Sequence, residues 1–235
     1  MSEDVLPTPG AIASLALLDD LTPAALQDAM VSASIRTLPR GTRIFDQGEP
    51  NQRAHALLTG GVRISQTGSD GNEVVIRFIG PGEIFGSVAI YTDRKYPADA
   101  TAMVDSIEVS WSRSDLLALM ERHSKIATNM IGIIGQRLAE LQERVRELAT
   151  HRTDRRVAHT LLRLLRQAGQ PVAGGTEIGF PLRRKDIADI SGTTLYTISR
   201  ILTKWERKGL LFSRNQRLVI CSLDRIRQIA ENGSG

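Results

Sequence analysis

The chain has 235 residues and a mass of 25.8 kDa, a length that fits one large or two modest domains and is short for a full catalytic barrel. Hydrophobic residues make up 41% of it and charged residues 24%, which excludes a disordered tail or a membrane bundle. Cys221 is the single cysteine, so we expect no internal disulfide, and the chain fits a reducing cytoplasm. The opening residues lack the basic flank of a secretory signal, and no apolar run reaches the roughly 18 residues of a spanning helix, so no membrane partner is expected.

Charge is unevenly distributed, although the formal net charge is only +4. From Thr150 onward there are 16 Lys or Arg against 7 Asp or Glu, a balance of +9, whereas the first 149 residues hold 14 against 19, a balance of −5. A basic part joined to an acidic part is expected where one domain binds a polyanion. A solvated basic surface would give the same count.

Short apolar runs separated by glycine turns occupy residues 36–112. The runs at 62–65 and 74–79 lie between turns such as Gly60-Gly61 and Gly68-Ser69-Asp70-Gly71. This pattern predicts a small antiparallel β sandwich or barrel. Since no strand–loop–helix unit follows these glycines, they do not indicate a dinucleotide-binding motif.

A long helix is predicted from about Ser114, its expected N-cap, to Leu148, because this stretch contains no proline. Apolar residues recur in it at alternating spacings of four and three, the a and d positions of a coiled coil. The spacing favours pairing with a second copy of the helix over packing on the chain's own β domain. The positions are Ala127, Ile131, Ile134, Leu138, Leu141, Val145 and Leu148.

The pattern after Thr153 predicts a winged helix–turn–helix. Ala188 and Gly192 are four residues apart, so a small side chain and a glycine let two helices cross closely around the turn at Ser191. The predicted segments are a helix from 153, a loop at 169–175, helices at 184–190 and 194–208, and wing strands at 210–212 and 218–220.

The helix at 194–208 is the predicted recognition helix, whose first two turns would enter the major groove of DNA. Arg200 is the candidate for a bidentate contact with guanine, with a phosphate contact or an internal salt bridge as alternatives. Ile198, Ile201, Leu202 and Trp205 are expected to face the core. Bases would be read by Leu195, Tyr196, Ser199 and Arg200, and phosphates bound by Thr194, Thr197, Lys204, Arg214 and Arg217.

These motifs, in this order, resemble the bacterial CRP/FNR transcription regulators, named for the cyclic AMP receptor protein and the fumarate and nitrate reduction regulator. The similarity covers nearly the whole chain and is carried by 81–86 (PGEIFG), the long helix, Arg156-Val157-Ala158 and 192–200 (GTTLYTISR). It implies an α+β fold with an N-terminal cyclic-nucleotide-binding-like β jelly roll, a long dimerisation helix and a C-terminal winged helix–turn–helix. It also implies a homodimer on double-stranded DNA with an inverted-repeat operator, and RNA polymerase as a partner at the loop 170–176.

The effector pocket that the resemblance implies departs from that of the cyclic AMP receptors. The glutamate that binds the ribose there corresponds to Ser87, and the arginine that binds the cyclic phosphate corresponds to Pro97 in an ungapped comparison. A buried phosphate without a cation is costly, so cAMP is not the expected ligand unless Arg94 or Lys95 supplies the charge. The candidate pocket residues are Phe85, Gly86, Ser87, Pro97, Ala98, Leu141 and Gln142.

Tyr196 is a second departure, because both named branches of the family carry glutamate at this position. The resemblance therefore does not imply a contact with a cytosine amino group at this position. Ser199 and Arg200 match the fumarate and nitrate reduction branch, which implies a TTG-like half-site.

The sequence leaves the cofactor open. An iron–sulfur cluster is not expected with one cysteine. A haem that senses nitric oxide or carbon monoxide is an alternative, because some family members respond to these gases and 192–197 is similar to denitrification-type branches. The histidines available to it are His55, His123, His151 and His159, and none has a spacing that marks a metal ligand.

We therefore predict a homodimeric, sequence-specific transcription regulator in which a signal other than cAMP changes the fit of two recognition helices to DNA. The predicted domains are an effector domain at 1–113, a dimerisation helix and hinge at 114–150, and a DNA-binding domain at 151–235. The alternative from another class is a nucleotide-binding or protein-docking module with a basic partner-binding domain. No Ser–His–Asp order, carboxylate pair or metal-ligand spacing predicts an enzyme.

Overall fold

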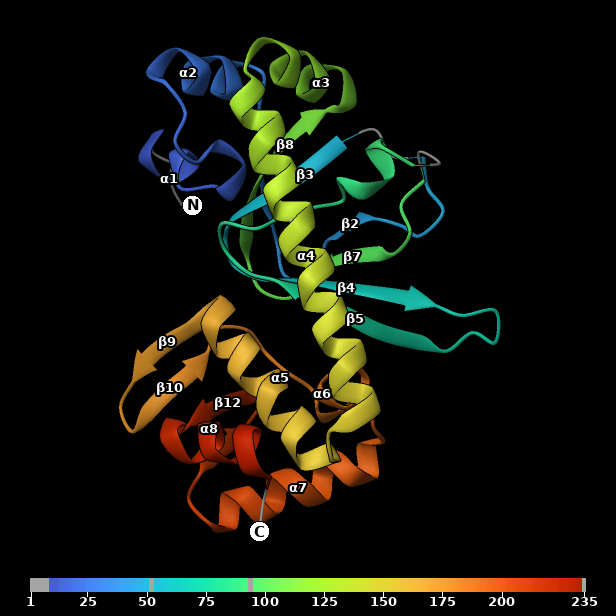
Figure 1. The fold of residues 1–235 in the computed structure, drawn as a ribbon, viewed down its shortest axis with the longest axis vertical. Helices are drawn as coiled ribbons and strands as arrows, with labels where there is room; N and C mark the ends of the chain where they lie inside the picture. Colours follow the sequence, from blue (N-terminus) through green and yellow to red (C-terminus); the bar gives the residue numbers. More distant parts are fainter. Residues whose placement is uncertain (1–8, 51–52, 93–94, 234–235) are drawn as a thin grey trace. The chain divides into compact units, whose positions relative to one another are not determined.

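The computed structural model describes residues 9–50, 53–92 and 95–233 and divides into two compact units. One unit comprises Met1–Val62 and Ile79–Ala139, and the other comprises Arg63–Phe78 and Glu140–Gly235. The elements up to residue 122 are α1 (Pro9–Ala13), η1 (Ala16–Leu18), α2 (Pro23–Val31), β1 (Ser34–Leu38), β2 (Arg43–Phe45), β3 (Arg53–Thr59), β4 (Val62–Thr67), β5 (Glu73–Ile79), β6 (Ile84–Phe85), η2 (Val88–Ile90), β7 (Asp99–Ala102), β8 (Ser106–Ser112) and α3 (Arg113–Arg122) (Figure 1). They are followed by α4 (Ser124–Thr150), α5 (Thr153–Ala168), β9 (Gly169–Val172), β10 (Gly175–Ile178), α6 (Arg184–Ser191), α7 (Leu195–Arg207), β11 (Leu211–Arg214), β12 (Arg217–Ile220) and α8 (Leu223–Asn232).

The strands up to residue 112 form two four-stranded sheets, with the orders β1-β8-β3-β6 and β2-β7-β4-β5. In the first sheet β8 pairs antiparallel with both β1 and β3. The predicted antiparallel β domain is therefore confirmed, and the runs at 62–65 and 74–79 lie in β4 and β5. Gly60 is required by the turn between β3 and β4, because its φ is +95° and a Cβ there would lie 2.1 Å from Oγ of Ser106.

The core of the first unit lies between its sheet and the helices α2, α3 and α4. Trp111 on β8 is fully buried, and its indole nitrogen donates a hydrogen bond to the carbonyl oxygen of Ala29 at 2.8 Å. The buried residues of α2, α3 and the start of α4 that pack in this core include Ala29, Leu116, Leu119, Ile126 and Met130. The beginning of α4 is thus fixed to the β domain through its apolar side.

The predicted single helix from Ser114 is wrong in its first part. The chain forms two helices, and Ser112 rather than Ser114 is the N-cap of α3, accepting a hydrogen bond from the backbone nitrogen of Asp115. The break is at His123, which leaves the helical conformation while its Nε2 lies 2.8 Å from a carboxylate oxygen of Asp28 on α2. A contact with a residue so distant in the sequence has no local signal.

The second unit contains the helix–turn–helix and its wing. The predicted helices at 184–190 and 194–208 are α6 and α7, and the wing is the hairpin of β11 and β12. The predicted loop at 169–175 is wrong, because these residues enter the hairpin of β9 and β10, which extends the wing sheet in the order β11-β12-β10-β9. Pro171 is compatible with a strand there because β9 is the edge strand.

Candidate nucleic-acid interface

The sequence at the start of α7 provides its own cap. The hydroxyl of Thr194 accepts a hydrogen bond from the backbone nitrogen of Thr197 at 3.2 Å and donates to the hydroxyl of Thr197 at 3.0 Å. Both predicted phosphate-binding threonines therefore lie at the N-terminus of α7, where the positive end of the helix dipole favours an anion.

The inner side of α7 anchors the helix in the second unit. Ile198, Leu202 and Trp205 are at most 1% exposed, as predicted, whereas Ile201 is only half-buried. Because these residues recur at spacings of three and four, they occupy one side of the helix and leave the opposite side free.

The outer side of α7 carries the predicted base-reading residues. Tyr196, Ser199 and Arg200 lie along one shallow hollow, together with Thr203, Lys204, Arg207 and Lys208. In the part of the chain that the structure describes, Arg200 forms no ion pair or hydrogen bond, so the internal salt bridge is not observed. The sequence interpretation missed Thr203, Arg207 and Lys208, although continuing the three-and-four spacing beyond Lys204 would have found them.

The turn between α6 and α7 is held by a residue of another helix. Gly192 adopts a left-handed conformation with φ 63° and ψ 50° and ends α6. The guanidinium of Arg156 on α5 donates hydrogen bonds to the carbonyl oxygens of Ser191, Gly192 and His151, each at 3.0 Å. Arg156 therefore fixes the angle at which α7 leaves the turn, a role that its place in the sequence motif does not reveal.

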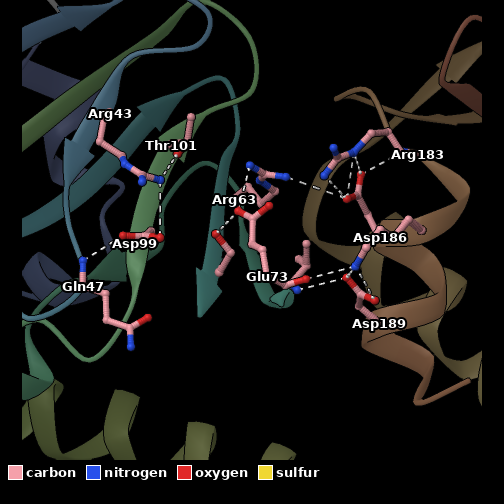
Figure 2. Close-up of polar contacts among 12 residues, drawn as sticks. Arg43, Gln47, Arg63, Glu73, Asp99, Thr101, Arg183, Asp186 and Asp189 are labelled. Carbon is pink, nitrogen blue, oxygen red and sulfur yellow. Dashed lines mark hydrogen bonds and ion pairs between the residues drawn. The ribbon is translucent and has the colours of Figure 1, made fainter. Parts of the chain in front are cut away.

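The hairpin of β4 and β5, which belongs to the same unit, holds the other side of α6. Nζ of Lys185 donates to the carbonyl oxygen of Glu73 at 3.0 Å and lies 2.9 Å from a carboxylate oxygen of Asp189. The same carboxylate accepts a hydrogen bond from the backbone nitrogen of Val75 at 3.2 Å. Figure 2 shows Asp189 on this side of α6, next to Glu73.

Asp186, one turn earlier on α6, forms a second contact with this hairpin (Figure 2). Its carboxylate is buried and lies 2.6 Å from the guanidinium of Arg183 and 4.0 Å from that of Arg63 on β4. Arg63 also pairs with Glu73 at 3.2 Å. The hairpin and α6 therefore share a network of charged groups.

The predicted phosphate-binding cations differ in their surroundings. Lys204 and Arg214 are exposed and have no charged partner among the described residues. Arg217 is also exposed, but its guanidinium lies 3.0 Å from the carboxylate of Glu177. This carboxylate partly offsets the positive charge that Arg217 presents to a ligand. Asn215 and Gln216 between these arginines have positive φ values of 51° and 65°, which form the tight turn of the wing.

The predicted effector residues differ in how far they are exposed. Phe85, Ser87 and Ala98 are buried, whereas Pro97, Leu141 and Gln142 are exposed. A Cβ at Gly86 would lie 3.0 to 3.1 Å from the rings of His55, Phe45 and Tyr96, so aromatic side chains of the chain itself fill the space beside this glycine. Lys95 forms a backbone bridge with Pro50, and Arg94 lies outside the described residues.

These aromatic rings are part of a buried polar cluster. Nδ1 of His55 lies 3.2 Å from a carboxylate oxygen of Glu108, and its Nε2 lies 3.0 Å from the hydroxyl of Tyr96. Phe45 stacks on Tyr96 with ring centroids 3.7 Å apart, and burial raises the pKa of Tyr96 to about 12. Because both ring nitrogens of His55 have partners, this histidine presents no free nitrogen to a haem iron.

The position predicted to bind the ribose carries a neutral side chain. Among the described residues, the Ser87 hydroxyl is buried and has no hydrogen-bond partner, and it offers a ligand one neutral group. A buried phosphate needs a cation or several donors, which one hydroxyl does not replace. Among the described residues there is also no group of three or more His, Cys, Asp or Glu that could hold a metal ion.

Glu108→Gln is expected to destabilise the protein by about 1 to 3 kcal/mol, because it leaves His55 and Arg36 without their carboxylate. Burial opposes ionisation of Glu108, but His55 and Arg36 outweigh it and hold the pKa of this carboxyl below its usual 4.5. The stability that Glu108 contributes is therefore complete above pH 4.5 and is lost as the pH falls through the lower, folded-state pKa.

Urea unfolding at several pH values measures this effect. The control is Asp20→Asn, which removes an ion pair whose carboxylate is 82% exposed and should change stability by less than about 1 kcal/mol. An equal effect of the two substitutions at neutral pH would contradict the role of the cluster.

Comparison with known proteins agrees with these features. Residues 35–123 match the family model of the cyclic nucleotide-binding domain, and residues 155–229 match that of the Crp-like helix-turn-helix domain. A cyclic AMP receptor protein from Thermus thermophilus is 31% identical over 83% of this chain and 87% of its own length. The chain belongs to the CRP/FNR family.

Other CRP/FNR relatives support the same assignment. The nitrogen fixation regulation protein FixK from Rhizobium meliloti is 29% identical over 79% of this chain and 81% of its own. The structure of FixK2 from Bradyrhizobium japonicum superposes with a TM-score of 0.72 at 26% identity, covering 83% of this chain and 96% of that one. The predicted family and CRP/FNR fold are confirmed, and these relatives are regulators rather than enzymes. Among the described residues, none of the helices has the length and apolar character to cross a membrane.

Proposed function

We propose that the chain is a homodimeric, sequence-specific DNA-binding transcription regulator of the cytoplasm, controlled through its β domain by a signal other than cAMP. The observation that carries the proposal is the outer side of α7. There Arg200, Lys204, Arg207 and Lys208 line one face without ion-pair partners among the described residues, opposite a fully buried apolar stripe. A rigid helix with one free, cationic face suits the major groove of DNA.

The base-reading and phosphate-binding roles divide along this surface. Arg200 and Ser199, in the second turn of α7, are proposed to read base edges together with Leu195 and Tyr196. Thr194 and Thr197 at the helix start, and Lys204 and Arg214 farther away, are proposed to bind phosphates. Arg217 is also proposed to bind a phosphate, which would replace the carboxylate of Glu177 as the partner of its guanidinium.

The proposed dimer is formed through α4. Six of its seven predicted a and d residues are exposed in the single chain, all except Ala127, with Ile131 at 71%, Leu138 at 56% and Val145 at 67%. A row of exposed large hydrophobic side chains along one helix is stabilised when a second copy covers it. Packing of this row on the chain's own β domain, the alternative interpretation, would bury these residues.

Control by the β domain is proposed to act through the hairpin of β4 and β5. Arg63 directly follows Val62 of the β domain, and Phe78 directly precedes Ile79, so a change in the β sheets has a covalent path into the hairpin. The hairpin contacts α6 through Glu73, Val75 and Arg63. A signal would thus change the populations of arrangements in which the two copies of α7 fit or misfit an inverted repeat.

The domain limits 1–113, 114–150 and 151–235 remain our proposal for the effector, dimerisation and DNA-binding parts. The β9–β10 hairpin is proposed as the RNA polymerase contact, since β9 is exposed along its whole length.

The test is selection of duplexes from random DNA, followed by titration of the selected duplex at increasing salt. We expect an inverted repeat, and a loss of affinity of about a thousandfold or more between about 50 and 200 mM salt, because several phosphate contacts release counterions. A module that docks on an acidic protein would select no sequence. That result would contradict the proposal.

A further inference from the structure

The first turn of α7 exposes two adjacent large hydrophobic side chains. Leu195 is 51% exposed and Tyr196 is 76% exposed, directly after the N-cap Thr194. In the described part of the chain, the Tyr196 hydroxyl has no hydrogen-bond partner. Single exposed hydrophobic residues are common on protein surfaces, but a pair at the leading end of a cationic helix indicates contact with an apolar group of the partner.

The fold itself does not require this pair. Ile198, Leu202 and Trp205 anchor α7 from its opposite side. Tyr196 instead shares the outer hollow with Ser199 and Arg200, which lie three and four residues further along. Side chains at these spacings are neighbours on one helix face, so Tyr196 and Arg200 are placed to meet neighbouring base pairs.

The chemistry of the major groove limits what Tyr196 can read there. Thymine is the base that presents an apolar group in this groove, the methyl group on its C5, whereas cytosine presents an amino donor. A carboxylate is the usual acceptor for that amino group. Tyr196 offers an aromatic ring and a neutral hydroxyl instead, and Leu195 adds only apolar surface.

We propose that Tyr196, together with Leu195, recognises the 5-methyl group of a pyrimidine next to the guanine bound by Arg200. This inference rests on the proposed function. It names thymine and 5-methylcytosine as the favoured bases at that position, over uracil and unmodified cytosine. The half-site therefore contains a methyl-bearing pyrimidine that is read by contact rather than by a hydrogen bond.

The experiment replaces each thymine of the selected duplex in turn by deoxyuridine, which removes the methyl group and keeps the hydrogen-bonding edge. We expect binding to weaken about threefold to tenfold at one position in each half-site, next to the guanine, because one buried methyl contact is lost. At those positions 5-methylcytosine should bind more tightly than cytosine. In Tyr196→Ala the difference between thymine and deoxyuridine should disappear.

Two matched variants distinguish the contribution of the Tyr196 ring to base preference from that of its hydroxyl and from the effect of a negative charge. Tyr196→Phe should keep the preference for thymine over deoxyuridine, and Tyr196→Glu should shift the preference toward cytosine. Loss of affinity in Tyr196→Phe as large as in Tyr196→Ala would overturn the inference, because it would assign the contact to the hydroxyl. A selected sequence that tolerates deoxyuridine at every position overturns this inference alone, whereas failure to select any sequence overturns it together with the proposed function.

Discussion

A Leu138→Lys, Leu141→Lys double variant is expected to be a monomer in solution and to lose about a hundredfold or more of its affinity for the selected inverted repeat. Both leucines are more than half exposed in the single chain, at 56% and 54%, and lie at neighbouring a and d positions of α4. Two lysines at such positions would bring four ammonium groups into one apolar seam. Without the seam each copy binds its half-site separately, and the gain from simultaneous binding is lost.

Sedimentation or size-exclusion chromatography with light scattering measures the oligomeric state. Ala139→Lys is the control for an added lysine, since it places one ammonium group on the same helix at an exposed position outside the a and d row. We expect this control to remain a dimer. A dimeric double variant would show that α4 does not hold the two copies together.

The parts of the fold that were predicted correctly have local signals. The three-and-four spacing of Ile198, Leu202 and Trp205 and the turn at Gly192 indicate α7 and its predecessor without any knowledge of tertiary contacts. The glycine turns likewise indicate where β4 and β5 begin and end, because a positive φ at a turn favours glycine at that position. The outer side of α7, which we propose faces DNA, follows directly, because it is the side opposite the buried stripe.

The parts that were missed depend on residues far apart in the sequence. The break between α3 and α4 involves the contact of His123 with Asp28, and the β9–β10 hairpin is completed by pairing of β10 with β12. Arg156 acts on carbonyl oxygens of Ser191 and Gly192, backbone atoms whose position no side-chain pattern encodes.

The surroundings of the predicted effector residues also depend on contacts between residues far apart in the sequence. Comparison of Ser87 and Pro97 with the cyclic AMP receptors predicts a ligand other than cAMP, but it does not reveal what surrounds these residues. Rings of His55, Phe45 and Tyr96, which come from different strands and a loop, meet beside Gly86 and fill the space there. Such convergence depends on the register of β3 against β6 and β8, which the sequence alone does not determine.

Arg200→Ala is expected to abolish most of the discrimination between the selected duplex and random DNA while leaving the dimer intact. A bidentate contact with guanine is worth about 1 to 3 kcal/mol of discrimination, so each half-site should lose roughly tenfold to a hundredfold. Arg200→Lys should restore little of the lost discrimination, because an ammonium group keeps the charge but not the planar fork of donors.

Arg207→Ala is the matched control, since Arg207 lies on the same face two turns further along and is placed to bind phosphate. It should weaken binding to both duplexes by similar factors and reduce the slope of affinity with salt by about one ion per contact. Titration of each variant on both duplexes measures the ratio directly. If Arg200→Ala lowered both affinities equally, Arg200 would be a phosphate ligand and α7 would require another residue to read the guanine.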